Sequence, residues 1–141
     1  MLVRLLYASR VSEPGPDALV EPILQQARRN NPDFGITGVL CYGGDIFLQA
    51  LEGGRDAVNA LYNRIACDKR HRQVTLLSYD EILERRFAGW TMGLVNLGKV
   101  NSSTLLKYSA KALIDPYTLP GRISCALTAE LMATASIIGR C

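Results

Sequence analysis

Side-chain amides stand at two places in this chain, one within an apolar run and one at a helix end, and amides are well suited to recognise the edge of a polar ligand. Gln49 lies between Phe47 and Leu51 in an apolar run, and Asn31 follows Asn30 where a helical pattern ends. A buried amide that lacks hydrogen-bond partners costs about 1–3 kcal/mol. Because an amide both donates and accepts hydrogen bonds, the sequence predicts a ligand edge that carries a donor beside an acceptor.

Strand alternation brings further side chains toward Gln49. Side chains alternate between the two faces of a strand, so three sets each share one face: Val3, Leu5 and Tyr7; Phe47, Gln49 and Leu51; Trp90 and Met92. If the apolar companions face the helices, Tyr7, Gln49 and one of Trp90 or Met92 converge beneath two helices.

The predicted helices supply side chains that suit a flat heteroaromatic ligand. Ile23 and Ile65, one from each helix, are placed to flank its two faces. Asn31 can pair with an edge that carries N–H beside C=O. Arg64 can donate to a second carbonyl and be held by Asp68 one turn later. This edge pattern matches the pyrimidine end of a flavin.

A flavin in this position would bring Gln49 to its N5/O4 corner, with Tyr7 hydrogen-bonded behind the amide. Each residue also has an ordinary structural explanation. Tyr7 alone can be a core tyrosine with a bonded hydroxyl, and Gln49 alone can be an exposed residue of an edge strand. Asn30 and Asn31 are common helix-end residues, so only the combination favours a binding site.

The elements that must position these residues follow from hydrophobic periodicity. Period-two and period-3.6 patterns alternate along the chain, with strands near 2–9, 36–42, 46–52, 74–77 and 90–97 and helices near 19–27 and 57–66. Two βαβ halves with both helices on one face form an α+β, ferredoxin-like βαββαβ sandwich with an additional strand. Two C-terminal helices, at 102–113 and 123–138, are expected to cover the other face. Pro22 is expected in the first turn of its helix, which would then start late.

Composition restricts the class of protein. A chain of 141 residues with 48% hydrophobic and 21% charged residues is one globular domain. It has no run of 18 apolar residues and starts directly on a strand pattern, so we expect a cytoplasmic protein without a membrane partner. The four cysteines are expected to be buried and reduced, and a single histidine gives little support for a metal site.

Nucleic acid is also an improbable partner on charge alone. The net charge is only +3, and a nucleic-acid binder usually has a denser basic face with interleaved aromatic residues. The one tight basic cluster spans residues 69–72 and is expected to be a solvated loop.

Five motifs in order resemble those of the BLUF domains, which are blue-light sensors that use flavin. They are L-Y-A-S at 6–9, R-N-N-P at 29–32, G-I-T-G at 35–38, F-L-Q-A-L-E-G at 47–53 and W-T-M at 90–92. The resemblance covers about residues 2–97, and the length of the chain is similar to that of short, stand-alone members with C-terminal helices. Ala27 is a departure, because several members carry serine there.

The resemblance implies a photochemical role for the named residues. Tyr7 would give an electron and a proton to the light-excited flavin, and Gln49 would rotate or tautomerise to give a red-shifted signalling state. The cofactor would be FAD, with FMN as the alternative, and Asn30, Asp68 and His71 would join the binding residues. Trp90 and Met92 would relay the signal.

The resemblance also implies an output partner. Residues 1–98 would form the flavin-binding sensor and residues 99–141 a helical extension, in one globular unit, for output and oligomerisation. The partner would be an effector protein, such as a phosphodiesterase or a response-regulator-like protein, and the sensor would form a homo-oligomer.

Two other functions are compatible with the same fold. A small flavin-dependent or acylphosphatase-like enzyme would need a nucleophile–base pair or a phosphate-binding loop, and residues 53–55 are too short for a P-loop. RNA binding through the sheet would need exposed aromatic residues on central strands, whereas the aromatic residues here share faces with aliphatic ones.

Overall fold

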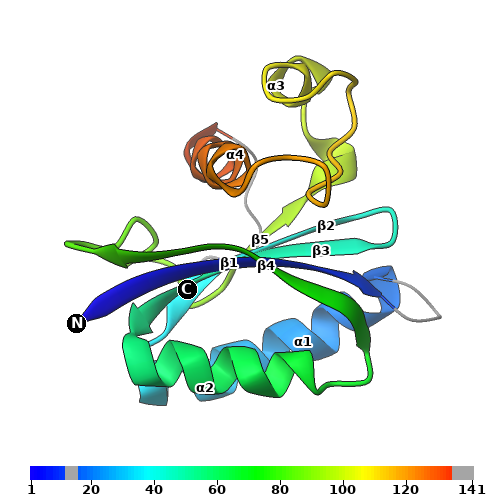
Figure 1. The fold of residues 1–141 in the computed structure, drawn as a ribbon. Coiled ribbons are helices and arrows are strands. Elements are labelled where there is room, and N and C mark those ends of the chain that lie inside the picture. The colour runs from blue at the N-terminus through cyan, green and yellow to red at the C-terminus, as the bar shows by residue number, and fades with distance from the viewer. Residues whose placement is uncertain (12–15, 135–141) are drawn as a thin grey trace.

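A five-stranded mixed sheet forms the centre of the molecule, with helices against both of its faces (Figure 1). The computed structural model describes residues 1–11 and 16–134. The strands are β1 (Leu2–Val11), β2 (Thr37–Gly43), β3 (Ile46–Gly54), β4 (His71–Ile82) and β5 (Gly93–Asn96). The α-helices are α1 (Pro16–Asn30), α2 (Arg55–Ala66), α3 (Ser102–Leu106) and α4 (Gly121–Thr134), with short 3-10 turns at Asn31–Phe34 and Leu97–Lys99.

The strand order confirms the predicted fold class. The order is β4-β1-β3-β2-β5, and the first four strands pair antiparallel in the arrangement of a ferredoxin-like βαββαβ unit. The additional strand β5 pairs parallel to β2 at the edge. The register of β1 and β3 sets Tyr7 directly opposite Gln49.

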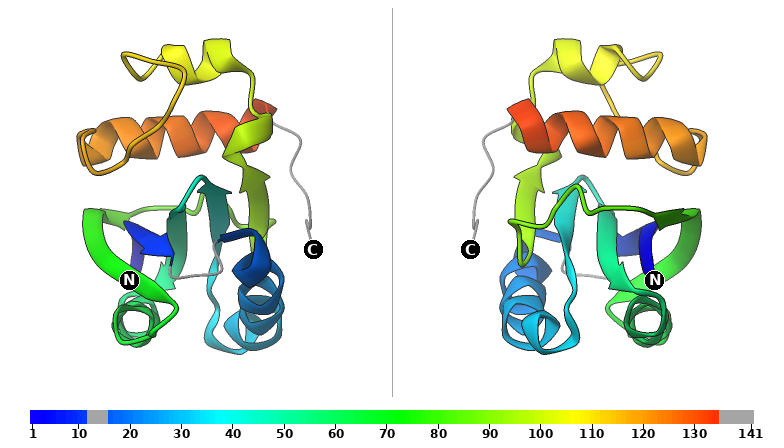
Figure 2. Two further views of the ribbon diagram at one scale, coloured as in Figure 1. Left: turned by 90° about the vertical axis from the view of Figure 1, so that its right-hand side faces the viewer. Right: turned by 90° about the vertical axis from the view of Figure 1, so that its left-hand side faces the viewer.

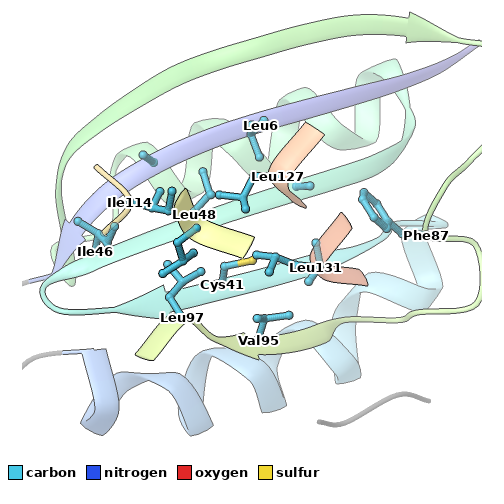
Figure 3. Close-up of a cluster of buried hydrophobic side chains, with 14 residues drawn as sticks. Leu6, Cys41, Ile46, Leu48, Phe87, Val95, Leu97, Ile114, Leu127 and Leu131 are labelled. Carbon is cyan, nitrogen blue, oxygen red and sulfur yellow. The ribbon is translucent and has the colours of Figure 1, made fainter. Parts of the chain in front are cut away.

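The sheet separates two hydrophobic cores. We call the first the α1/α2-face core, and it includes Val3, Leu5, Tyr7, Val20, Leu24, Phe47, Leu51, Val58 and Met92. The second, the α4-face core, includes Leu6, Ala8, Cys41, Leu48, Phe87, Val95, Leu105, Leu127 and Leu131 (Figure 3). The strand parity predicted for β1 and β3 is thus correct.

The C-terminal helices lie on the face opposite α1 and α2, as the side views also show (Figure 2). Leu127 and Leu131 of α4 are fully buried in the α4-face core. The central strands β1 and β3 are thereby almost wholly buried on both faces. No helix in the described part of the chain is long and apolar enough to cross a membrane.

Several element boundaries differ from the sequence prediction. Strand β4 spans His71–Ile82 rather than 74–77, because it is an edge strand whose residues are mostly exposed or half-buried and do not alternate cleanly. It includes part of the basic cluster that was expected to form a loop. Strand β5 is shorter than 90–97, since residues 90–92 lie outside the strand, with a bend at 91–92, and Leu97 begins a 3-10 turn.

The helix predictions also need correction. Helix α1 begins at Pro16 and continues through Pro22. Both Pro22 and Ala18, whose carbonyl it cannot bond, are exposed, so water can satisfy that carbonyl. The helix predicted at 102–113 ends at Leu106, and the chain then turns to bury Ile114 in the α4-face core. Residues 135–138 of the other predicted helix lie outside the described residues.

The three cysteines in the described part of the chain are free, but only one of them is fully buried. Cys41 is buried in the α4-face core, where desolvation raises the pKa of its thiol to about 12. Cys125 is half-buried, and Cys67, just past the end of α2, is exposed, contrary to expectation. Cys141 lies outside the described residues.

Candidate functional site

A cavity opens between α1 and α2 above the central strands β1 and β3. Tyr7 and Gln49 form its floor. Nine residues singled out from the sequence line it: Tyr7, Ile23, Asn30, Asn31, Gln49, Arg64, Ile65, Asp68 and His71. Ile23 comes from α1 and Ile65 from α2, so the two helices contribute one apolar wall each.

A chain of three polar groups runs across the floor of the cavity. The Tyr7 hydroxyl donates a short hydrogen bond to Gln49 Oε1. Gln49 Nε2 in turn donates to Met92 Sδ at 3.4 Å. All three side chains are buried, and a thioether sulfur is a weak acceptor. The amide is therefore held firmly on its oxygen side and weakly on its nitrogen side.

Met92, and not Trp90, lies beside Gln49. Met92 belongs to the α1/α2-face core, whereas Trp90 packs against the α4-face core. The prediction that these two residues share a face is wrong, because the chain at 90–92 bends and does not follow strand alternation. The backbone carbonyl of Met92 accepts a hydrogen bond from Arg28 at 3.2 Å.

Asn31 presents an unused donor at the end of α1. The residue is 4% exposed, and its buried Nδ2 atom has no hydrogen-bond partner in the protein. Such a group costs about 1–3 kcal/mol. A ligand that accepts a hydrogen bond from Asn31 would remove this cost.

Electrostatics keep the Tyr7 hydroxyl protonated. Burial raises the pKa of Tyr7 well above its usual value of 10.0, and the nearby Tyr62 and Asp68 raise it further. The rings of Tyr7 and Tyr62 are 5.7 Å apart. The phenol is thus a neutral hydrogen-bond donor over the whole physiological pH range.

The predicted pairing of Arg64 with Asp68 is wrong. Helix α2 ends at Ala66, so Asp68 lies beyond the last turn. Asp68 instead pairs with Arg70 at 2.6 Å, and the hydrogen bond from Arg70 is the main cause that lowers the pKa of the Asp68 carboxyl. The Arg64 guanidinium lies 5.9 Å from the centre of the Phe34 ring and remains at the cavity wall.

His71 closes the cavity at the start of β4. Its Nδ1 is 2.8 Å from the Ser9 hydroxyl, and its ring lies 5.6 Å from that of Phe47 and 6.4 Å from that of Tyr7. Desolvation is the main cause that lowers the pKa of His71; Arg70 lowers it further and Asp68 opposes both. Within the described residues, no cluster of three or more histidines, cysteines or acids could hold a metal ion.

Four lining residues were not proposed as binding residues from the sequence: Gln26, Ala27, Leu61 and Arg70. Helical spacing could have found three of them, because Gln26 and Ala27 lie one turn after Ile23 and Leu61 lies one turn before Ile65. Arg70 follows the end of α2, where no periodic pattern applies.

Residues 2–93 match the family described as sensors of blue-light using FAD. The chain belongs to the BLUF family. A match over most of the chain confirms the resemblance seen in the motifs and identifies a photosensory domain, in place of the enzyme considered on the same fold.

The BLUF relatives include both long and short chains. The blue light- and temperature-regulated antirepressor BluF of Escherichia coli (strain K12) is 34% identical over 97 residues, which cover 69% of this chain and 24% of that protein. The photo-activated state of BlsA matches with a TM-score of 0.85 at 32% identity, covering 96% of this chain and 98% of that one. Klebsiella pneumoniae BlrP1 with FMN and cyclic diGMP matches with a TM-score of 0.68 at 34% identity, covering 76% and 29%. This chain therefore spans about a quarter of the E. coli relative.

The residues of this BLUF chain fit a flavin ring. The Asn31 Nδ2 atom, which has no hydrogen-bond partner, and Arg64 offer donors for ring carbonyls at the cavity wall. Ile23 and Ile65 offer apolar surfaces, one from each helix, for the two faces of a planar ring. Gln49 offers an amide whose nitrogen is only weakly engaged.

Proposed function

We propose that Tyr7 and Gln49 form the light-responsive switch of this flavin sensor. The observation that carries the proposal is the buried hydrogen-bond chain from Tyr7 through Gln49 to Met92 on the floor of the cavity. It links a phenol, an amide and a weak acceptor, so that a change at the phenol can reverse the orientation of the amide.

Each residue has a defined task in this switch. Bound flavin supplies absorption of blue light and, when excited, an acceptor for an electron from Tyr7. A tyrosine that has lost an electron becomes strongly acidic, and Gln49 Oε1 is positioned to receive its proton. Gln49 then rotates or tautomerises and gives up its weak hydrogen bond to Met92. The proton and electron then return to Tyr7 while Gln49 remains rotated or tautomerised, and in darkness the amide relaxes to its original arrangement between Tyr7 and Met92.

We infer that the remaining lining residues hold the cofactor. Asn31 and Arg64 bind the ring edge, Ile23 and Ile65 cover its faces, and Asn30, Asp68 and His71 complete the wall. FAD is the proposed cofactor, in line with the description of the family. FMN is the alternative, since it is present with Klebsiella BlrP1. Release of the flavin by denaturation, followed by chromatography against FAD and FMN standards, identifies it.

The proposed output runs from Met92 and Trp90 to the helical extension at 99–141, while residues 1–98 act as the sensor. Met92 contacts the switch, and Trp90 packs against the core that contains Leu127 and Leu131. The partner is an effector protein, either a phosphodiesterase or a response-regulator-like protein, and the sensor self-associates. The cyclic diGMP bound with Klebsiella BlrP1 favours the phosphodiesterase.

Absorption spectroscopy tests the switch directly. The purified protein should be yellow, shift its flavin band to the red under blue light and recover in darkness. Tyr7→Phe should retain flavin and lose this shift, because the donor to Gln49 is gone.

Tyr62→Phe is the matched control, since its ring is the close neighbour of Tyr7 but the hydrogen bond to Gln49 comes from Tyr7. This control should keep the shift. A normal reversible shift in Tyr7→Phe would contradict the proposed switch.

A further inference from the structure

The segment between β4 and β5, residues 83–92, passes from one face of the sheet to the other. Phe87 lies in the α4-face core, together with Leu131 of α4 (Figure 3), and Trp90 packs against the same core. Met92, at the end of the segment, lies in the α1/α2-face core against Gln49. This short segment therefore contacts both Gln49 of the proposed switch and the α4-face core.

Glu52 binds the beginning of this segment. Its carboxylate accepts a hydrogen bond from the backbone N–H of Phe87 at 2.7 Å on Oε1 and from that of Arg86 at 3.0 Å on Oε2. Arg4 on β1 pairs with Oε2 at 2.7 Å. The Glu52 side chain is completely buried; its bond to Phe87 is buried as well, and those to Arg86 and Arg4 are half-buried.

Glu52 and Gln49 are three residues apart on β3 and therefore point to opposite faces of the sheet. Gln49 binds the end of the segment at Met92, and Glu52 binds its beginning at Arg86 and Phe87. The same strand thus holds the segment at two points. Between them, the Trp90 carbonyl accepts a hydrogen bond from the Gly38 N–H of β2 at 3.1 Å.

Packing alone does not explain a buried carboxylate at position 52. Charges are costly to bury unless they are paired and fully hydrogen-bonded, and an apolar side chain on β3 would fill the same core without that cost. Glu52 directs both oxygens to main-chain donors of a segment that has no regular secondary structure. Charge-assisted bonds of this kind are stronger and more directional than neutral ones.

We propose that Glu52 is a positioning residue that fixes Arg86 and Phe87 as the pivot of the segment. Because Arg86 and Phe87 are held in place, a displacement of Met92 moves Trp90 and reaches the α4-face core. Without this pivot, the whole segment would shift and the displacement would not reach that core. This role rests on the proposed switch at Tyr7 and Gln49. In addition to that switch, Glu52 would set how long the light-induced state lasts and how far its structural change reaches the α4-face core.

Glu52→Gln tests the pivot with little change of shape. The amide can still accept from Phe87, but its NH2 group meets the donors of Arg4 and Arg86. We expect the variant to keep its flavin and its red shift, since both depend on the other face of the sheet. Dark recovery should be at least threefold faster, because a loosened segment lets Met92 return more easily. The light-induced change in hydrogen exchange of α4 should fall to less than half.

Ile46→Val is the matched control, because Ile46 lies on the same strand and in the same core but away from the segment. A loss of stability alone would affect both variants, whereas only Glu52→Gln should change the recovery rate. Recovery within a factor of two of wild type in Glu52→Gln would overturn the pivot. Absence of a red shift in the wild-type protein would instead overturn the switch itself.

A measurement on the unaltered protein decides the matter if Glu52→Gln does not fold. Amide exchange followed by NMR should show the Arg86 and Phe87 N–H groups equally protected in the dark and under light, as a pivot requires. The Gly38 N–H, bound to the moving Trp90 carbonyl, should exchange at least threefold faster under light. Loss of protection at Arg86 and Phe87, or no change at Gly38, would overturn the proposal.

Discussion

At the scale of single residues, the site combines a firmly neutral phenol with an amide held unequally at its two ends. Tyr7 is buried and its pKa is raised, so it keeps its proton until an electron is removed. Gln49 accepts from this phenol and donates only to a sulfur atom. The hydrogen bond to the Met92 sulfur is the weaker of the two and can be broken at small energetic cost. The amide can therefore adopt either of two orientations.

The raised pKa of Tyr7 predicts how stability depends on pH. Below the usual tyrosine pKa of 10.0 both folded and unfolded chains keep the proton. At higher pH the unfolded chain loses it while the folded chain retains it, so stability falls as pH rises. Between pH 9 and pH 11 the wild type should lose about 1.4 kcal/mol more than Tyr7→Phe, as measured by urea unfolding. Equal losses would show that Tyr7 ionises normally in the folded protein.

The orphan donor of Asn31 predicts separate effects on binding and on folding. Asn31→Ala should weaken flavin binding about tenfold or more, because a hydrogen bond to a ring carbonyl is lost. Unfolding of the flavin-free protein should change by less than about 1 kcal/mol, since removal of an unsatisfied buried donor offsets the lost packing. Flavin titration and urea unfolding of the apoprotein check the two effects, and unchanged affinity would remove Asn31 from the site.

Sequence reasoning reached most of the lining residues but not all of their partners. Strand alternation correctly placed Tyr7 and Gln49 on one face, because β1 and β3 are regular strands. It failed for Trp90 and Met92, which precede β5 in a stretch that is not strand. Helical spacing paired Arg64 with Asp68, yet the helix ends first and Asp68 turns to Arg70. The spacing of residues in a helix or strand does not predict contacts for residues that lie beyond the end of that element.

At the scale of elements, the contact between α4 and β4 depends on a glycine. A Cβ atom on Gly121 would lie 1.9 Å from the Leu77 carbonyl oxygen, so only glycine permits the first turn of α4 to approach β4 this closely. The docking of the helix is thus set by backbone contact as well as by Leu127 and Leu131.

Gly121→Ala should therefore lift the start of α4 from the sheet. We expect a loss of about 1–3 kcal/mol in unfolding free energy and faster hydrogen exchange across α4, with flavin binding retained on the opposite face. Gly54→Ala serves as a control, since a Cβ there meets no atom within 4 Å and its φ of −62° suits alanine; it should cost about 1 kcal/mol at most. Equal effects of the two substitutions would argue against the close contact.

Element types were predicted better than element lengths. The strand–helix order and the ferredoxin-like arrangement follow from hydrophobic periods, and they are confirmed. Strand β4 was underestimated because an edge strand buries little of either face. Helix α1 was placed too late because Pro22 was assumed to need the first turn, although an exposed proline is tolerated inside it.

At the scale of the whole molecule, two cores share one sheet, and a signal from the proposed switch would have to cross that sheet to reach α4. The side of the proposed flavin site is built from α1, α2 and the odd-numbered residues of β1 and β3, while the opposite side is covered by residues after β5. Residues of β1, β2 and β3 thus share the α4-face core with residues of α3 and α4, which supports the proposal that the sensor and the helical extension form one folded unit.

Removal of the extension tests this unity. A chain that ends after Lys99 would lose Leu127 and Leu131, both fully buried, and these two side chains alone contribute about 3–6 kcal/mol. A domain of this size is stable by only about 5–15 kcal/mol, so the shortened chain should unfold at much lower urea concentration or self-associate through the exposed α4-face core. Urea unfolding and size-exclusion chromatography measure the two outcomes. A monomeric, yellow protein with an unchanged unfolding midpoint would show that the first 99 residues fold independently. It would also show that α4 contributes nothing to the stability of the α4-face core.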